Sequence, residues 1–129
     1  MILLDEQVRE DQRGLLSGWG IHFRQIGREI AASGTQDADI IPWLHSLKRS
    51  TFFTHDRWFF QRRLCHTAYC LIWLDVKDIE AAGFIRRFLR HPEFLTHKDR
   101  LGRVIRLHHE GIEFWVRATS RSTKVAWPS

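Results

Sequence analysis

The chain has 129 residues, 43% of them hydrophobic, with nine phenylalanines and six tryptophans. A chain of this length and composition is expected to fold as one domain around its own core, which excludes a disordered protein and a small disulfide-stabilised scaffold. Lys and Arg number 20 against 15 Asp and Glu, for a formal net charge of +5. This balance is typical of proteins that bind phosphate-bearing partners, and equally of a solvated basic surface.

The apolar runs of the chain are short, and none approaches the ~20 residues needed to cross a bilayer. The amino terminus reaches the acids Asp5 and Glu6 too early for a signal peptide. We therefore expect a cytoplasmic protein with no membrane segment. Cys65 and Cys70 are expected to be thiols of the core, because two cysteines supply too few ligands for a structural zinc ion.

Apolar runs and a helical pattern alternate at the start of the chain. Residues 1–4 predict a strand, residues 8–17 a helix and residues 20–24 a second strand. The face of this helix that is expected to be buried carries Val8, Leu15, Leu16 and Trp19. Glycines at positions 18 and 20 end the helix.

Residues 27–36 have the composition of a loop and precede a second helical pattern. Apolar residues recur at helix spacing over residues 40–47, and either Asp37 or Asp39 is placed to cap the first turn. Pro42 favours Asp39, because proline is tolerated only near the start of a helix. In both cases the carboxylates lie at the entrance of this helix.

The rest of the chain continues the alternation. It predicts a strand at residues 51–54, a short helical piece at 58–64 and a strand at 71–74. A helix that Asp78 caps follows at residues 79–91, and two hairpin strands follow at 104–107 and 112–116. The buried face of the helix after Asp78 is expected to carry Ile79, Ala82, Ile85, Phe88 and Leu89. This order predicts an α/β fold with a mostly parallel sheet covered on both faces and a C-terminal β-hairpin. We expect the domain to span residues 1–118, and residues 119–129 to form a polar, mobile tail apart from Trp127.

Two of the predicted strands end at acids. Asp5 follows the first strand, and Asp56 follows the strand at residues 51–54. If these strands are parallel neighbours, both acids emerge from one edge of the sheet, where the helix entrance at Asp37 and Asp39 can reach them. Carboxylates gathered in this way repel one another, and a set of oxygen ligands suits Mg²⁺ or Mn²⁺. Such an ion can activate water for phosphodiester cleavage.

Each of these residues also has a simpler role open to it. Asp5 could cap the helix that begins near Val8, Asp37 and Asp39 could be caps only, and Asp56 could form an Asx turn. Thr54 could bond to Asp56 or to a metal-bound water, or be an ordinary hydroxyl at a strand end. His55 is expected at the surface, because its side chain points opposite to those of its neighbours.

Basic and aromatic residues follow the same strand. Arg57, Arg62 and Arg63 could bind backbone phosphates, or could belong to a solvated face. Trp58 could stack on bases or pack at a subunit contact. Asp75, which follows the strand at residues 71–74, could supply a further carboxylate.

Three segments carry a resemblance to a known family. In chain order they are Ile2-Leu3-Leu4-Asp5-Glu6, Gln36-Asp37-Ala38-Asp39-Ile40-Ile41 and Phe52-Phe53-Thr54-His55-Asp56-Arg57-Trp58-Phe59. They resemble the PIN-like family of small prokaryotic proteins, in which a leading Leu-Leu-Asp-Glu, a middle Ser-Asp-x-x-Ile and a Val-Thr-x-Asp-x-Asp-Phe recur in this order. The match is close over the first half of the chain and holds in outline over the second half.

The resemblance implies a three-layer α/β/α PIN-like fold and an Mg²⁺- or Mn²⁺-dependent ribonuclease, often the toxin of a toxin–antitoxin pair. Carried over by position, the catalytic and metal-binding acids are Asp5, Asp37 and Asp56, with Glu6 and Asp39 as further metal ligands. The substrate-binding residues are then Thr54, Arg57, Arg62 and Arg63, with RNA as the substrate.

One position departs from the family's pattern. Trp58 stands where the second acid after the threonine is expected. The lost carboxylate would be a metal ligand or a group that orients one, and losing an orienting group alone typically lowers metal affinity or activity ~10- to 100-fold. The alternative is therefore a PIN-like domain that has lost catalysis and binds nucleic acid or a partner protein. Its hairpin edge and Trp127 are candidates for pairing with an antitoxin protein or with a second copy of the chain.

Overall fold

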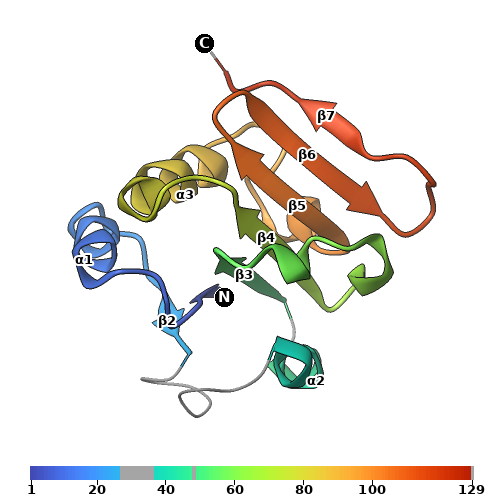
Figure 1. The fold of residues 1–129 in the computed structure, drawn as a ribbon, viewed down its shortest axis with the longest axis horizontal. Helices are drawn as coiled ribbons and strands as arrows, with labels where there is room; N and C mark the ends of the chain where they lie inside the picture. Colours follow the sequence, from blue (N-terminus) through green and yellow to red (C-terminus); the bar gives the residue numbers. More distant parts are fainter. Residues whose placement is uncertain (27–36, 48, 129) are drawn as a thin grey trace.

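The structure is a computed structural model that describes residues 1–26, 37–47 and 49–128. This part of the chain forms an α/β fold with one seven-stranded sheet, in the order β2-β1-β3-β4-β5-β6-β7 (Figure 1). The strands are β1 (Ile2–Leu4), β2 (Arg24–Gln25), β3 (Ser50–Thr54), β4 (Tyr69–Leu74), β5 (Arg103–His108), β6 (Gly111–Val116) and β7 (Thr123–Val125). Strands β1 to β5 pair in parallel, whereas β6 pairs antiparallel with both β5 and β7. The expected α/β class with a mostly parallel sheet is confirmed.

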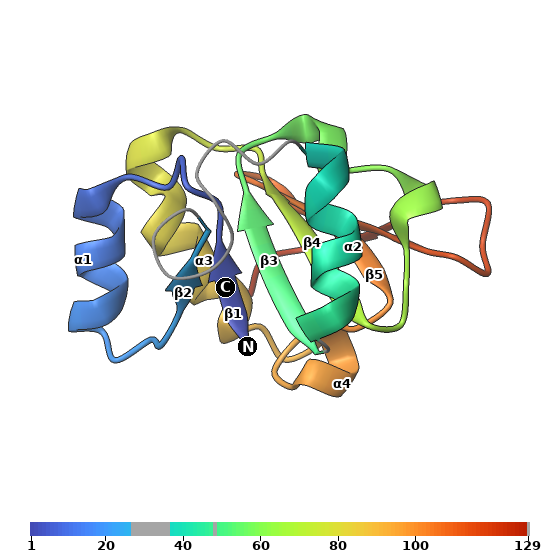
Figure 2. The ribbon, with the colours of Figure 1, turned by 90° about the horizontal axis from the view of Figure 1, so that it is seen from below.

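Helices pack on both faces of the sheet. They are α1 (Glu10–Gly18), α2 (Asp37–Leu47), α3 (Ala81–Leu89) and α4 (His97–Arg100), with 3₁₀ turns η1 (Arg57–Phe59), η2 (Arg62–Leu64) and η3 (Asp78–Glu80). Successive strand residues point to opposite faces, so Leu4 and Phe53 join the core under α1 and α3, while Leu3 and Phe52 join the core under α2. Figure 2 shows α2 lying across β3, away from α1 and α3. None of the helices described is long and apolar enough to span a membrane.

The first helix is confirmed, but its predicted buried face is half wrong. Val8 and Leu16 are fully buried, whereas Leu15 and Trp19 are 46% and 38% exposed. Val8 lies in a turn before the helix, where its backbone N–H donates to the Asp5 carbonyl, and it is buried together with Leu16, eight residues later. The buried face of α1 instead runs through Gln12 and Leu16, four residues apart.

The second strand lies later than expected. Instead of residues 20–24, the strand is the two-residue β2, in which Arg24 and Gln25 pair with Leu3 and Leu4. The predicted loop at residues 27–36 lies outside the described residues.

Three details of the predicted helices are wrong. The helix after β4 begins at Ala81, because residues 78–80 form the tighter turn η3, and this leaves Ile79 59% exposed. Asp78 caps neither element: Lys77 is the N-cap of η3, where its backbone N–H donates to the Glu80 carboxylate, and Glu80 is the N-cap of α3. The helical piece expected at residues 58–64 is divided between the two short 3₁₀ turns η1 and η2.

Part of the segment assigned to a tail belongs to the sheet. Strand β7 pairs with β6, and the Trp127 indole Nε1 donates to the His108 carbonyl at 2.7 Å. The His91 imidazole contacts the Ala126 carbonyl at 3.0 Å. These contacts hold the end of the described chain against β5 and α3.

Candidate functional site

The first two strand-end acids are brought together by the register of β1 and β3. Leu4 pairs with Phe53, and the Asp5 backbone N–H donates to the Phe53 carbonyl at 2.9 Å. The fully buried Thr54 therefore lies beside Asp5, and its hydroxyl donates to Asp5 Oδ2 at 2.6 Å. The same hydroxyl accepts from the Asp56 backbone N–H at 3.0 Å. The expected parallel pairing of these strands is confirmed, and one hydroxyl joins the Asp5 carboxylate to the Asp56 backbone.

Asp5 does not cap a helix. The N-cap residue of α1 is Arg9, four residues later. The half-buried Asp5 side chain also accepts from the Gln7 backbone N–H, at 3.4 Å, and it forms no ion pair with any residue that the structure describes. Its carboxylate is thus oriented by Thr54 and is left without a protein cation in this part of the chain.

The Asp56 side chain bonds the backbone two residues on, as in the Asx turn considered for it. Its Oδ1 accepts from the Trp58 backbone N–H at 2.8 Å and so caps η1. The second oxygen, Oδ2, makes no hydrogen bond to a described residue. Because each carboxylate oxygen has two lone pairs, capping η1 leaves the group able to accept a further partner.

The first turn of α2 lies at the same edge of the sheet, because α2 runs antiparallel to β3 (Figure 2). This turn carries Asp39, which is exposed, and Asp37, whose side chain lies outside the part of the structure that is described. Glu6 is half-buried and follows Asp5 directly. Across residues 1–26, 37–47 and 49–128, no three His, Cys, Asp or Glu side chains form a group that could hold a metal ion.

Gln25 is a residue that the sequence analysis did not identify. Its side chain is almost fully buried, and its amide Nε2 donates to the carbonyls of Asp5, Glu6 and Val8 at 3.2 to 3.3 Å. One side chain therefore fixes the backbone that carries the first acids. Only its place at the end of β2 could have indicated this role, and the prediction began that strand four residues too early, at residue 20 instead of Arg24.

The basic residues after β3 do not form one phosphate-binding group. Arg57 is exposed. The Arg62 guanidinium donates to the Arg117 carbonyl at 2.7 Å, and the Arg63 Nε donates to Gln61 Oε1 at 2.8 Å.

Trp58 is half-buried and packs edge-to-face on Phe59, with ring centroids 5.1 Å apart. At the position where the PIN-like motif has an acid, Trp58 therefore packs against the core beneath α2. The Arg63 guanidinium lies over the same ring, 5.5 Å from its centroid.

The third strand-end acid has a cation of its own. Arg106 donates from Nε and Nη2 to Asp75 Oδ2, at 2.9 and 2.7 Å. This pair neutralises Asp75, which is a physical reason against its acting as the missing ligand. The prediction that His55 lies at the surface is wrong, since its side chain is only 12% exposed and lies against the Leu74 carbonyl and Asp78.

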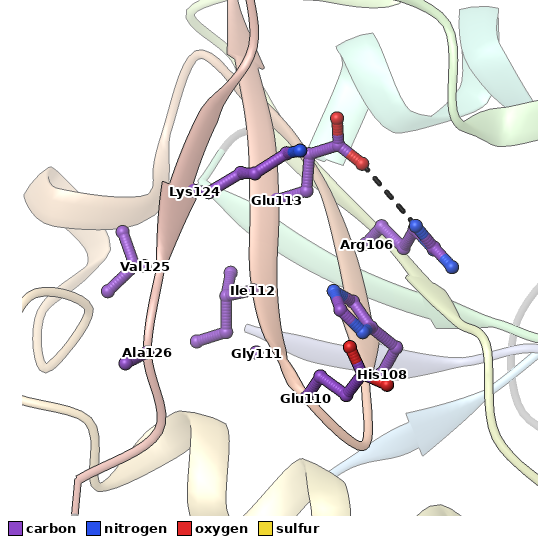
Figure 3. Close-up of a pocket in the computed structure, with 9 residues that line it drawn as sticks. All are labelled: Arg106, His108, Glu110, Gly111, Ile112, Glu113, Lys124, Val125 and Ala126. Atoms are coloured by element: carbon purple, nitrogen blue, oxygen red, sulfur yellow. Dashed lines mark hydrogen bonds and ion pairs between the residues drawn. The ribbon is translucent and has the colours of Figure 1, made fainter.

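Two hollows lie along the sheet beside these acids. One, of about 470 Å³, is lined by Arg57, Phe60, Trp73, Asp75, Arg106 and Glu113. The other, of about 530 Å³, lies over β5, β6 and β7, and Figure 3 shows Arg106, His108, Glu113 and Lys124 along it. Burial lowers the pKa of His108, which favours a neutral imidazole. The two hollows meet at Arg106 and Glu113, which form an ion pair at 3.5 Å.

Comparison of the chain with models of protein families, with curated proteins and with solved structures finds no match.

Proposed function

We propose that this chain is a PIN-like, divalent-metal-dependent ribonuclease with the three-layer α/β/α arrangement of that family. The observation that carries the proposal is the pair of hydrogen bonds of Thr54, which join the Asp5 carboxylate to the Asp56 backbone N–H at the carboxyl ends of the parallel strands β1 and β3. Ligands bind at this edge of open α/β sheets. The net charge of +5 supports a polyanionic substrate such as RNA.

The donor set fits Mg²⁺ or Mn²⁺. Both ions prefer oxygen ligands, and Mg²⁺ is commonly held by only one or two carboxylates, with waters and substrate phosphates in the other positions. Asp5 and Asp56 would hold the ion, and Asp37, Asp39 and Glu6 are the further carboxylates at this edge. When bound, the ion supplies an activated water and neutralises charge on the scissile phosphate.

The protein's own residues have distinct tasks in this proposal. Thr54 holds the Asp5 carboxylate in one orientation, and Gln25 holds the backbone from Asp5 to Val8. Arg57 is exposed beside Asp56 and would bind a backbone phosphate. Arg62 and Arg63 would bind RNA away from the acids, because Arg62 donates to the carbonyl of Arg117, which follows Val116, the partner of Arg103 at the start of β5.

The test compares Asp5→Asn and Asp56→Asn with the parent chain. Asparagine keeps an oxygen that can accept from Thr54 at position 5 and from the Trp58 N–H at position 56, so both variants are expected to fold. We expect Mn²⁺-dependent cleavage of single-stranded RNA to fall at least ~100-fold in each, because each loses a metal ligand. Calorimetric titration with Mn²⁺ should show the same loss without relying on activity.

The matched control is Glu93→Gln, which removes one negative charge from an exposed position remote in sequence from the site. This variant should cleave RNA and bind Mn²⁺ as the parent does. Unchanged cleavage in both Asp variants would refute the proposed site.

A second candidate function is a PIN-like domain that binds nucleic acid or a partner protein without cleaving. It is favoured by Trp58, which packs into the core where an acid is expected, and by the use of Asp56 Oδ1 as a cap. RNA binding that persists in a chelator, with no cleavage in Mg²⁺ or Mn²⁺, would select this function over the first.

The proposal includes the role of a toxin that a partner antitoxin neutralises. Strand β7 is at one edge of the sheet and offers backbone groups for pairing with an antitoxin or with a second copy of the chain. Light scattering on the purified chain, alone and with a co-expressed candidate antitoxin, would show which of these complexes forms.

A further inference from the structure

The hollow of about 470 Å³ that Asp75 and Arg57 line has the size of a small-molecule site. We call it the Trp73 pocket. Trp73 and Arg106 are paired across β4 and β5, and both point away from the core that holds Leu74 and Leu107. The floor of the pocket is therefore a regular sheet, whose side chains are held in place by strand pairing.

The pocket offers an aromatic surface. The half-buried Trp73 ring lies 5.7 Å from Phe60, with an angle of 39° between the rings. The Arg106 guanidinium lies 5.4 Å from the Trp73 centroid and that of Arg57 lies 5.8 Å from it. Arg57 is exposed, so it can move to admit a flat ligand, whereas Arg106 is fixed by its ion pairs. Proteins recognise unpaired nucleic-acid bases by stacking them on such aromatic and guanidinium surfaces.

The polar groups of the pocket include one carboxylate oxygen with unused capacity. Arg106 donates twice to Asp75 Oδ2, and Glu113 Oε2 accepts from the Ser122 hydroxyl at 2.6 Å. Asp75 Oδ1 makes no hydrogen bond to any described residue, and the Asp75 side chain is 37% exposed. A carboxylate accepts only, so this oxygen selects a base edge that presents N–H groups.

Guanine fits this requirement better than uracil. Its Watson–Crick edge presents adjacent ring and amino N–H donors, whereas the single ring N–H of uracil is flanked by two carbonyl oxygens that a carboxylate repels. A base on Trp73 would also lie close to the proposed catalytic edge, because Arg57 lines the pocket and directly follows Asp56. On the other side, the pocket continues into the hollow of Figure 3, which carries Lys124 for a backbone phosphate.

We propose that the Trp73 pocket binds one unstacked base of a single-stranded RNA and prefers guanine to uracil. The inference deepens the proposed function and rests on it for the identity of the nucleic acid as RNA. The stacking surface is Trp73, and the group that selects the base is Asp75.

The experiment measures the binding of two labelled RNAs by fluorescence anisotropy in a chelator, so that no cleavage is needed. The probes are a short oligouridine and the same oligomer with one central guanosine. We expect the guanosine oligomer to bind about 10- to 150-fold more tightly, as for a hydrogen bond to one charged oxygen. Equal affinities for the parent chain would overturn the proposal.

Two pairs of variants locate the effect. Trp73→Leu should weaken binding of the guanosine oligomer about 5- to 150-fold, the usual effect of losing one stacked base, while Trp115→Leu on the same face of the sheet should not. Asp75→Asn should abolish the guanine preference, because its amide offers a donor as well as an acceptor, while Glu93→Gln should keep it. Parent-like binding by Trp73→Leu, or parent-like preference in Asp75→Asn, would overturn the assignment.

A further variant guards against a trivial loss of the fold. Trp73→Phe keeps an aromatic ring in β4 and should retain the guanine preference with weaker binding, with an unchanged circular dichroism spectrum. Loss of the preference in this folded variant would count against stacking on position 73. A guanine preference without Mn²⁺-dependent cleavage would refute the nuclease while leaving the pocket as proposed, so the two failures are distinguishable.

Discussion

The most direct test of how this site is built is Thr54→Val. Valine has nearly the shape of threonine and a higher strand propensity, so the substitution removes the hydroxyl and little else. Thr54 is fully buried at the end of β3, and its hydroxyl makes two hydrogen bonds, to Asp5 Oδ2 and from the Asp56 N–H. Both bonds are lost in the variant.

The expected destabilisation follows from those two bonds. A hydrogen bond to a charged group contributes about 1.5–3 kcal/mol, and a buried donor left without a partner costs about 1–3 kcal/mol. Because Asp5 and Asp56 are half-buried and water can replace part of the loss, we expect a total of about 2–3 kcal/mol. With an unfolding entropy of about 0.27 kcal/mol/K for 129 residues, Tm should fall by about 7–11 °C.

Differential scanning calorimetry and urea unfolding measure this change, and Thr54→Ser is the matched control. Serine keeps the hydroxyl and loses a methyl group, so it should recover most of the stability of the parent chain. In Mn²⁺ titrations, Thr54→Val should bind the ion more weakly than Thr54→Ser, because Asp5 is no longer oriented. Equal stability of the valine variant and the parent, or equal destabilisation by serine and valine, would refute the reasoning.

Two further predictions concern the backbone and the pH dependence. Gly83 lies on the exposed side of α3 with open space around it, so Gly83→Ala should stabilise the chain by about 0.5–1 kcal/mol, measured by urea unfolding. Gly111→Ala should destabilise the chain in the same assay, because its Cβ would lie 2.8 Å from the Val125 carbonyl oxygen. Burial lowers the pKa of His108 below its ordinary value of 6.5, so the unfolded chain binds its proton more readily and stability should fall as pH drops below about 6.5. His108→Gln should flatten that dependence and the exposed His22→Gln should not, and a parent-like slope in His108→Gln would contradict the assignment.

The sequence predicts the strands that are rich in apolar residues and misses those that are not. Strands β3 and β4 are apolar runs buried on both faces, which is the pattern that distinguishes parallel strands. Strands β2 and β7 have two and three residues, and their pairing rests on backbone hydrogen bonds that almost any side chain permits. The close approach of the Val125 carbonyl in β7 requires a glycine at position 111 in β6, and this glycine is a sign of the pairing in the sequence.

The site shows the same division. The meeting of Asp5 and Asp56 follows from the rule that parallel strands present their carboxyl ends at one edge, and it needs no knowledge of side-chain contacts. The contacts of Gln25 with the Asp5 loop and of Arg106 with Asp75 join residues that are far apart in the chain. Such tertiary partners leave no periodic signal, so only the structure reveals that Asp75 is neutralised and Asp5 is held.

The contrast between the strand-end acids bears on which of the two proposed functions holds. At one edge of the sheet, Asp75 has Arg106 as its cation, while Asp5 has none among the described residues. If Asp5 served only to accept the hydrogen bond from Thr54, an asparagine could do the same. A carboxylate at this half-buried position costs free energy that asparagine would not. Retaining the charge is what a site for an external cation requires. Asp5→Asn should therefore be at least as stable as the parent in a chelator and should lack the rise in Tm that Mn²⁺ gives the parent; a parent-like rise would place the ion elsewhere.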